Sequence, residues 1–389
     1  MISLETENDQ KENKNNNIII NDINNNNINE SKLQFSPAPN LIYQEDLISY
    51  CDCVCGLNES FDFFKSIKDN NDYLIISNKN NNNIEIINIY TKEVIKVIDG
   101  NEDKFISLKY YLNPKNKNEF LVAADVKNTI KIIDITNDYK VISIIKSPKH
   151  FENTWKFINC AVLFNFKIGS NNPIDIVIVS SRTRYMEECP TKMYNMYTGG
   201  LIKDISNTNK NRTRFIIPWY NEINQKYYII ECCEDLLIVV SLLFNEVYAK
   251  FSEERNKSFS SGFVYKKNMI DFLFVSTSCN EINIYSLFDQ IMIKTIKISN
   301  KFDNIRLYGL LLWNEKYLIV SDDTNKGIKI IDLRINKVIS NINNRHKASV
   351  RCIKKINHKD LGECLLTAGD DNTIKLWKNI PNIIKPIFE

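Results

Sequence analysis

Side chains that could carry catalytic or metal chemistry are few in this sequence. Among 389 residues there are three histidines, His150, His346 and His358, and ten cysteines. No spacing joins one of these histidines to a nucleophile and a carboxylate, as a catalytic triad would require. The sequence also contains no glycine-rich phosphate loop and no Cys-x-x-Cys pair. It therefore predicts a protein that is not an enzyme and that uses no cofactor and no metal.

Three of the cysteines, Cys51, Cys53 and Cys55, are spaced two residues apart, so on a strand their thiols would point to one face. A zinc site would need a fourth ligand, usually from a second pair, and none is close in sequence. We interpret the three as buried thiols. Because the chain shows no leader with a basic head and an apolar run, its thiols indicate a reduced protein of the cytoplasm or nucleus. Its apolar runs are far shorter than the ~20 residues of a membrane span, so no membrane partner is expected.

Arginine is scarce, with nine residues against 41 lysines, yet the triplet Arg-Thr-Arg occurs twice. Arg182 and Arg184 form the first triplet; Arg212 and Arg214 form the second, which follows Lys210. Guanidinium groups make bidentate hydrogen bonds to carboxylates and phosphates, which lysine cannot match. We expect these five residues to bind an acidic or phosphorylated peptide of a partner protein; the alternative is a pair of solvated basic loops. A net charge of only +3 gives no indication of nucleic-acid binding.

Short β-rich runs must position these residues. Residues 35–389 read as a repeated unit of four runs rich in Ile, Val, Tyr and Phe, separated by Asn, Asp, Lys and Pro. Seven units can be counted, although the text between residues 150 and 255 also allows six or eight. Only ten glycines are present, so asparagine is expected to supply left-handed turn residues. Residues 1–34 are polar and rich in asparagine, and they are predicted to be a disordered tail.

The last unit, residues 346–377, contains the clearest motif. His346 precedes its first run, Thr367 lies on the second, Asp371 in the following turn and Trp377 on the third. This arrangement resembles the Trp-Asp (WD) repeat, the unit of one class of β-propellers. In that family the four side chains form a hydrogen-bonded chain, and the resemblance implies the same structural tetrad here. The other units share the pattern of runs but not this motif.

The predicted fold is therefore all-β: a single β-propeller, most simply of seven four-stranded blades. In WD-repeat propellers the two kinds of loop that hold the Arg-Thr-Arg triplets emerge on one face. The resemblance thus implies a non-enzymatic scaffold that binds partner proteins through its loop-bearing top face, as part of a larger complex. An alternative follows from Ile331–Arg334, which resembles the Trp-Asp-x-Arg box of substrate receptors on cullin-type ubiquitin ligases.

A propeller ring must be closed by a strand from one end of the chain, because an open ring would expose sheet edges. We expect residues 47–55 to pair with the last blade. The competing segment is residues 383–388, in which Pro386 would be tolerated only on an outer edge.

Overall fold

Alternation of short apolar runs with polar turns produces strands along the whole chain, and the part that the structure describes contains no helix. The structure is a computed structural model. The predicted tail, residues 1–34, and the competing closing segment, residues 383–388, lie outside the described residues. These residues are 38–49, 51, 61–100, 104–127, 129–146, 155–168, 172–183, 191–205, 213–233, 235–252, 257–298, 307–322, 326–343 and 345–379.

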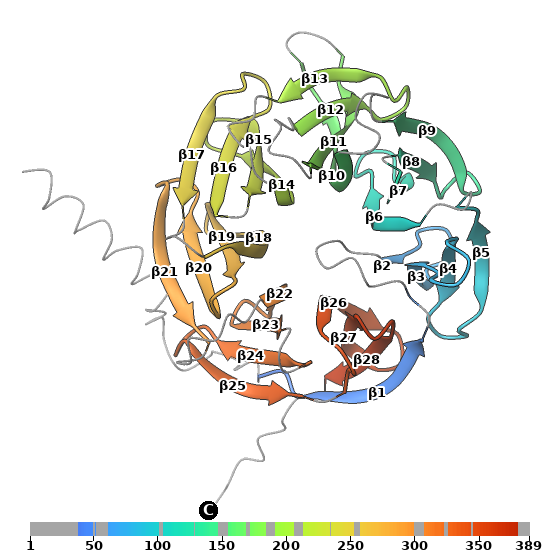
Figure 1. Ribbon diagram of the computed structural model, residues 1–389, viewed down its shortest axis with the longest axis vertical. Helices are drawn as coiled ribbons and strands as arrows, with labels where there is room; N and C mark the ends of the chain where they lie inside the picture. Colours follow the sequence, from blue (N-terminus) through green and yellow to red (C-terminus); the bar gives the residue numbers. More distant parts are fainter. Residues whose placement is uncertain are drawn as a thin grey trace, which may run out of the picture.

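Strands β2 to β25 form six antiparallel sheets of four consecutive strands, and each sheet is one blade of a ring. The first strand of a blade lines the centre of the ring and the fourth forms its outer rim (Figure 1). Blade 1 contains β2 (Phe61–Lys65), β3 (Asp72–Ser77), β4 (Ile84–Asn88) and β5 (Val94–Ile98). Blade 2 contains β6 (Phe105–Leu112), β7 (Glu119–Asp125), β8 (Thr129–Asp134) and β9 (Lys140–Lys146). Blade 3 contains β10 (Trp155–Phe166), β11 (Ile174–Thr183), β12 (Thr191–Asn195) and β13 (Leu201–Ile205).

Blades 4 to 6 repeat this arrangement around the ring. Blade 4 contains β14 (Thr213–Asn221), β15 (Lys226–Cys233), β16 (Leu236–Ser241) and β17 (Val247–Ser252). Blade 5 contains β18 (Phe259–Lys267), β19 (Ile270–Thr277), β20 (Glu281–Ser286) and β21 (Ile291–Lys297). Blade 6 contains β22 (Leu307–Trp313), β23 (Tyr317–Asp322), β24 (Ile328–Asp332) and β25 (Lys337–Ile342).

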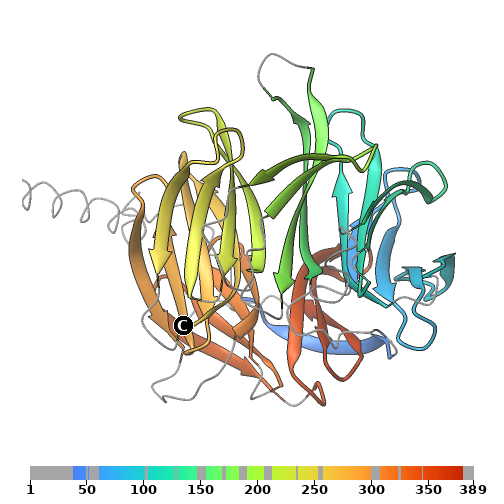
Figure 2. The ribbon, with the colours of Figure 1, turned by 45° about the horizontal axis from the view of Figure 1, so that its top comes forward.

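Blade 7 joins the two ends of the chain. Its three inner strands are β26 (Val350–His358), β27 (Gly362–Gly369) and β28 (Ile374–Asn379), and its outer strand is β1 (Leu41–Ile48). Figures 1 and 2 show β1, in blue, beside the red strands of this blade. The prediction of an all-β propeller with seven four-stranded blades is therefore confirmed.

The closing strand lies earlier in the chain than predicted. We expected residues 47–55, but β1 pairs with β28 from Leu41, opposite Asn379, to Ile48, opposite Ile374. After Ile48 the chain turns to blade 1, where Cys51 forms an isolated bridge with Asn78. The pairing stops at Ile48 because β28 begins at its partner, so no strand partner remains for the residues that follow. Cys53 and Cys55 lie outside the described residues.

The core is divided into clusters, each of which fills the space between two neighbouring blades. Middle strands are therefore covered on both faces, and β3 is buried at every residue. Such strands are nearly continuous apolar runs, whereas the rim strand β5 exposes most of its residues. This contrast explains why the sequence shows apolar runs of unequal strength within each unit.

The ring has two faces with different connections. Because the four strands of a blade are consecutive and antiparallel, the turns after its first and third strands lie at the same end. Each fourth strand leads to the next first strand, so every blade presents the same end to the same side. We call the side with these hairpin turns the turn face, and the side where first strands begin the loop face. Left-handed residues of these hairpin turns include asparagines, as predicted, among them Asn70, Asn245 and Asn314.

Candidate functional site

The four residues of the predicted tetrad form one hydrogen-bonded chain in blade 7. The Trp377 Nε1–H donates to Thr367 Oγ1 at 2.8 Å, and Thr367 Oγ1 lies 2.8 Å from His346 Nε2. His346 Nδ1 lies 3.0 Å from both carboxylate oxygens of Asp371. Because a carboxylate only accepts, Nδ1 carries the proton and Nε2 accepts from the threonine hydroxyl. All donors of this buried chain are satisfied.

The tetrad has a clear electrostatic consequence for Asp371. Burial alone would raise the pKa of this carboxyl, but hydrogen bonds from His346 and Thr373 and the backbone N–H of Lys347 oppose it. The pKa of Asp371 is held well below its usual range as a result. The side chain thus ties the segment before β26 to the turn before β28, which is a structural role.

The predicted arginine site can be placed only in part. Arg184, Lys210 and Arg212 lie outside the described residues. Arg182 was expected in a turn, but it lies in β11, where its backbone pairs with Lys156 of β10. Arg214 was expected in the link between two blades, but it is the second residue of the inner strand β14 and is half-buried. Whether the five basic residues converge stays a prediction.

Arg334, on which the ubiquitin-ligase alternative depends, makes contacts within its own blade. Its guanidinium donates to both carboxylate oxygens of Asp332, at 3.0 Å to Oδ1 and 2.5 Å to Oδ2. It also donates to the hydroxyl of Tyr317 at 3.0 Å. These bonds join the turn after β24 to β23. They give Arg334 a structural use, and its use in docking stays a prediction.

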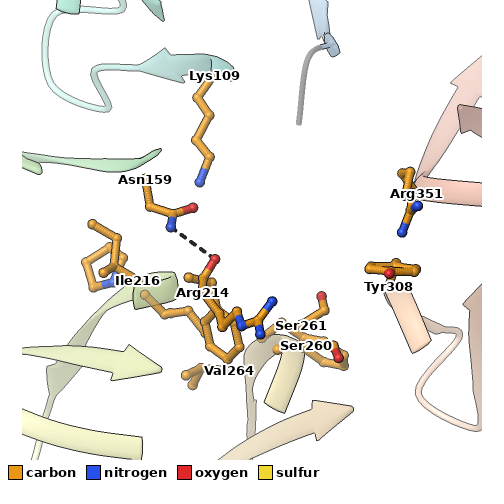
Figure 3. A pocket seen from close by; sticks show the side chains of 14 residues that line it. Lys109, Asn159, Arg214, Ile216, Ser260, Ser261, Val264, Tyr308 and Arg351 are labelled. Carbon is orange, nitrogen blue, oxygen red and sulfur yellow. Dashed lines mark hydrogen bonds between the residues drawn. The ribbon is translucent and has the colours of Figure 1, made fainter. Parts of the chain in front are cut away.

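The first strands of blades 4 to 7 share a β-bulge near the loop face. In each, the register of pairing with the second strand shifts next to the second residue. A bulge leaves one residue unpaired and turns its side chain in a new direction. Blade 2 has the same bulge, at Ile106. The residues at this position in blades 4 to 7 are Arg214, Ser260, Tyr308 and Arg351, and all four line a cavity in the centre of the ring (Figure 3).

This cavity, which we call the channel mouth, has a volume of about 450 Å³. Lys109 of β6 and Asn159 of β10 complete its polar lining from blades 2 and 3. Asn159 donates to the backbone oxygen of Arg214 at 3.0 Å, so it fixes one end of β14 (Figure 3). The sequence analysis missed this site, because a bulge has no signature in residue type: its position holds arginine, serine and tyrosine in different blades.

A second feature that the sequence analysis missed lies on the turn face. Ile223 and Phe244 occupy two turns of blade 4, and Met269 and Phe288 occupy two turns of blade 5. Each of these four side chains is between 50% and 70% exposed. We call them the apolar turn patch. The sequence does contain a signal for this patch: large apolar residues occur at turn tips, where Gly, Asn, Asp, Ser and Pro are normally favoured.

Contacts between the turns hold the apolar turn patch in place. The Tyr248 hydroxyl of blade 4 donates to the backbone oxygen of Phe288 in blade 5 at 3.4 Å. An ion pair joins Lys266 of blade 5 to Glu222 of blade 4. Within blade 4, Lys226 Nζ lies 5.0 Å from the centre of the Phe244 ring. These contacts join turns of two neighbouring blades that carry the patch residues.

The fold and these surfaces define the class: the chain is a seven-bladed β-propeller. Among solved structures it is similar to BBS1N in complex with ARL6DN soaked with mercury, with a TM-score of 0.64 and 11% identity over 88% of this chain and 98% of that chain. The same complex soaked with lead gives a TM-score of 0.60 and 12% identity, over 86% of this chain and 98% of that chain. At this identity the similarity shows the fold alone. No protein-family model and no curated protein sequence matches the chain.

Within the described residues, no helix is long and apolar enough to cross a membrane. Their His, Cys, Asp and Glu side chains form no group of three or more that could hold a metal ion.

Proposed function

We propose that this protein is a non-enzymatic interaction scaffold that binds a partner protein through the apolar turn patch. The observation that carries the proposal is the exposure of Ile223, Phe244, Met269 and Phe288 on neighbouring turns. Several large apolar side chains exposed on neighbouring turns indicate an interaction site more strongly than a scattered single residue does. The resemblance to WD repeats, carried by blade 7, supports the same class of function.

The charges around the patch favour a protein over a membrane surface. Glu222, Glu246 and Asp289 lie in the same turns as the apolar side chains, beside Lys226 and Lys266. An anionic membrane attracts a strongly basic surface, and these carboxylates would oppose it. An apolar centre with a rim of both charges is instead the usual composition of a protein–protein interface. We therefore expect the partner to be a protein with an apolar contact surface.

The similar solved structures are consistent with this proposal. They contain BBS1N, a chain of the same fold, in complex with another protein, ARL6DN. A rigid ring with short turns can hold a binding surface without ordering it on association, which limits the entropic cost of binding. We further propose that the complex forms in the cytoplasm or nucleus, since that compartment was inferred from the cysteines.

The test is affinity purification followed by mass spectrometry and measurement of binding to the purified partner. The test variant is the double substitution Phe244→Ser and Met269→Ser. The control is Val94→Ser with Val97→Ser on the rim strand β5, two residues of comparable exposure in blade 1. We expect one set of partners with the parent chain and the control, and its loss with the test variant, at an unchanged melting temperature. Equal recovery by all three chains would rule out the apolar turn patch, and recovery of no specific partner would rule out the scaffold function.

The arginines of the two Arg-Thr-Arg triplets and Arg334 give two further variants for the same experiment. Charge reversal at Arg182, Arg184, Arg212 and Arg214 tests whether an acidic or phosphorylated peptide is bound there. Arg334→Ala tests the substrate-receptor alternative, which requires a cullin adaptor among the partners and its loss in this variant. If neither variant changes the partners recovered, both alternatives fail and the apolar turn patch is unaffected.

A further inference from the structure

The channel mouth concentrates positive charge. Lys109, Arg214 and Arg351 reach it from blades 2, 4 and 7, and no carboxylate is among the described residues that line it. Within the described part of the chain, Lys109 Nζ has no ion-pair partner. Around these groups the hydroxyls of Ser260, Ser261 and Tyr308 supply hydrogen-bond donors from blades 5 and 6.

Arg351 is held in position by contacts with Asp370 and with Tyr308. Its Nε donates to Asp370 Oδ2 at 2.7 Å, and its guanidinium carbon lies 4.0 Å from the centre of the Tyr308 ring. A guanidinium fixed in this way loses little freedom on binding a further anion. Its Nη1 is buried and has no hydrogen-bond partner within the described part of the chain, so this donor is unsatisfied there. An unsatisfied buried donor of a charged group is costly, and a ligand would remove that cost.

We propose that the channel mouth binds a small phosphorylated molecule with two or more negative charges. The Asp370 carboxylate balances the charge of Arg351, and the charge of Lys109, which has no ion-pair partner among the described residues, remains for the ligand to balance. Phosphate oxygens accept from several donors at once, and lysine, arginine and hydroxyl donors all line this cavity. A volume of about 450 Å³ is within the range of small-molecule sites.

The position of the lining residues favours a small molecule over a polymer. All of them belong to the first strands of their blades, which face one another across the inside of the ring. A nucleic-acid chain would need a groove that continues over the surface, as single-strand binding sites have. The cavity lies toward the loop face, whereas the apolar turn patch lies on the turn face. The two sites therefore lie on different faces, and the proposal for one does not depend on the proposal for the other.

The experiment is calorimetric titration of the full chain at low ionic strength with pyrophosphate, with ATP and with an oligothymidylate. We expect pyrophosphate and ATP to bind with a stoichiometry of one and to raise the melting temperature. Lys109→Gln should weaken binding about tenfold or more, since charge-assisted hydrogen bonds contribute at that level. Its melting temperature without ligand should equal that of the parent, because Lys109 has no ion-pair partner among the described residues to lose. Arg214→Gln should weaken binding similarly.

The matched control is Lys115→Gln, an exposed lysine in the turn that follows the same strand, on the turn face. It should leave the affinity for pyrophosphate unchanged. The proposal is overturned if neither pyrophosphate nor ATP binds, or if Lys115→Gln and Lys109→Gln weaken binding equally, which would indicate diffuse charge attraction. Tighter binding of the oligothymidylate than of ATP, with the same dependence on Lys109, would make the channel a nucleic-acid site and would also overturn it.

Discussion

Glu231 is a carboxyl group buried inside blade 4. Counted from the β-bulge, it occupies the position that Thr367 has in blade 7, opposite Ile216 as Thr367 is opposite Ile353. Burial raises the pKa of Glu231 to about 7, and a hydrogen bond with Thr191 opposes this only in part. One of its carboxyl oxygens has no hydrogen-bond partner. The blade thus holds a group that prefers to be protonated when folded.

This preference predicts a dependence of stability on pH. The folded state binds the Glu231 proton more tightly than the unfolded state, whose pKa is near 4.5. The contribution of Glu231 to stability is therefore complete below pH 4.5 and is lost as the pH rises toward 7. A shift of this size corresponds to about 3 kcal/mol. Glu231→Gln removes the titration, so its unfolding free energy relative to the parent should rise between pH 5 and pH 8 in urea unfolding. An equal difference at both values would contradict the assignment.

The tetrad predicts an order among conservative substitutions. Thr367→Val keeps the shape of the side chain but leaves Trp377 Nε1 and His346 Nε2 without their partner in a buried site. Trp377→Phe removes only one donor and keeps an aromatic ring against Tyr43. Unsatisfied buried groups cost about 1 to 3 kcal/mol each, so Thr367→Val should be the more destabilising variant. Thermal unfolding of both variants checks this, and the reverse order would show that ring volume matters more than the hydrogen bonds.

At the scale of single elements, a close approach at β22 predicts a costly glycine substitution. Gly309 lies in the bulge of this strand, and its N–H donates to Ser321 Oγ at 2.7 Å. An added Cβ would lie 2.8 Å from Ile353 Cγ1 of the next blade. Overpacking of this kind costs about 1 to 3 kcal/mol, so Gly309→Ala should lower the melting temperature. Gly200→Ala is the control, because the nearest atom to its added Cβ is a threonine hydroxyl at 3.3 Å.

Most strands could be predicted from the sequence, because middle strands covered on both faces must be apolar runs. Their ends could not. Arg182 and Arg214 lie in strands because backbone pairing continues past the apolar residues, and that pairing does not depend on side-chain type. The bulges that form the channel mouth escaped prediction for the same reason. The apolar turn patch left a visible signal in the sequence, but its meaning depended on knowing which turns share a face.

The ring as a whole depends on β1 for closure. Without it, β28 would expose the unpaired backbone groups of an edge strand in an otherwise closed blade, and such edges promote association. Deleting residues 1–48 should therefore convert a monodisperse protein into oligomers or aggregates, as measured by size-exclusion chromatography with light scattering. Deleting residues 1–34 is the control and should change neither the mass nor the melting temperature. A monodisperse product from the longer deletion would show that another segment closes the ring.

Closure by β1 also sets the order of events during synthesis. The backbone N–H of Asn40 donates a hydrogen bond to the side-chain oxygen of Asn379, which lies 339 residues later in the chain. At about 5 to 20 residues per second, the ribosome needs roughly 20 to 70 s to make that intervening chain. Throughout that interval β1 has no strand to pair with, and its apolar residues Leu41, Leu47 and Ile48 lack the cover that blade 7 supplies. A chain that stops before Ile374 never makes β28, the strand that pairs with β1. An unpaired β1 therefore distinguishes an incomplete chain from a complete ring.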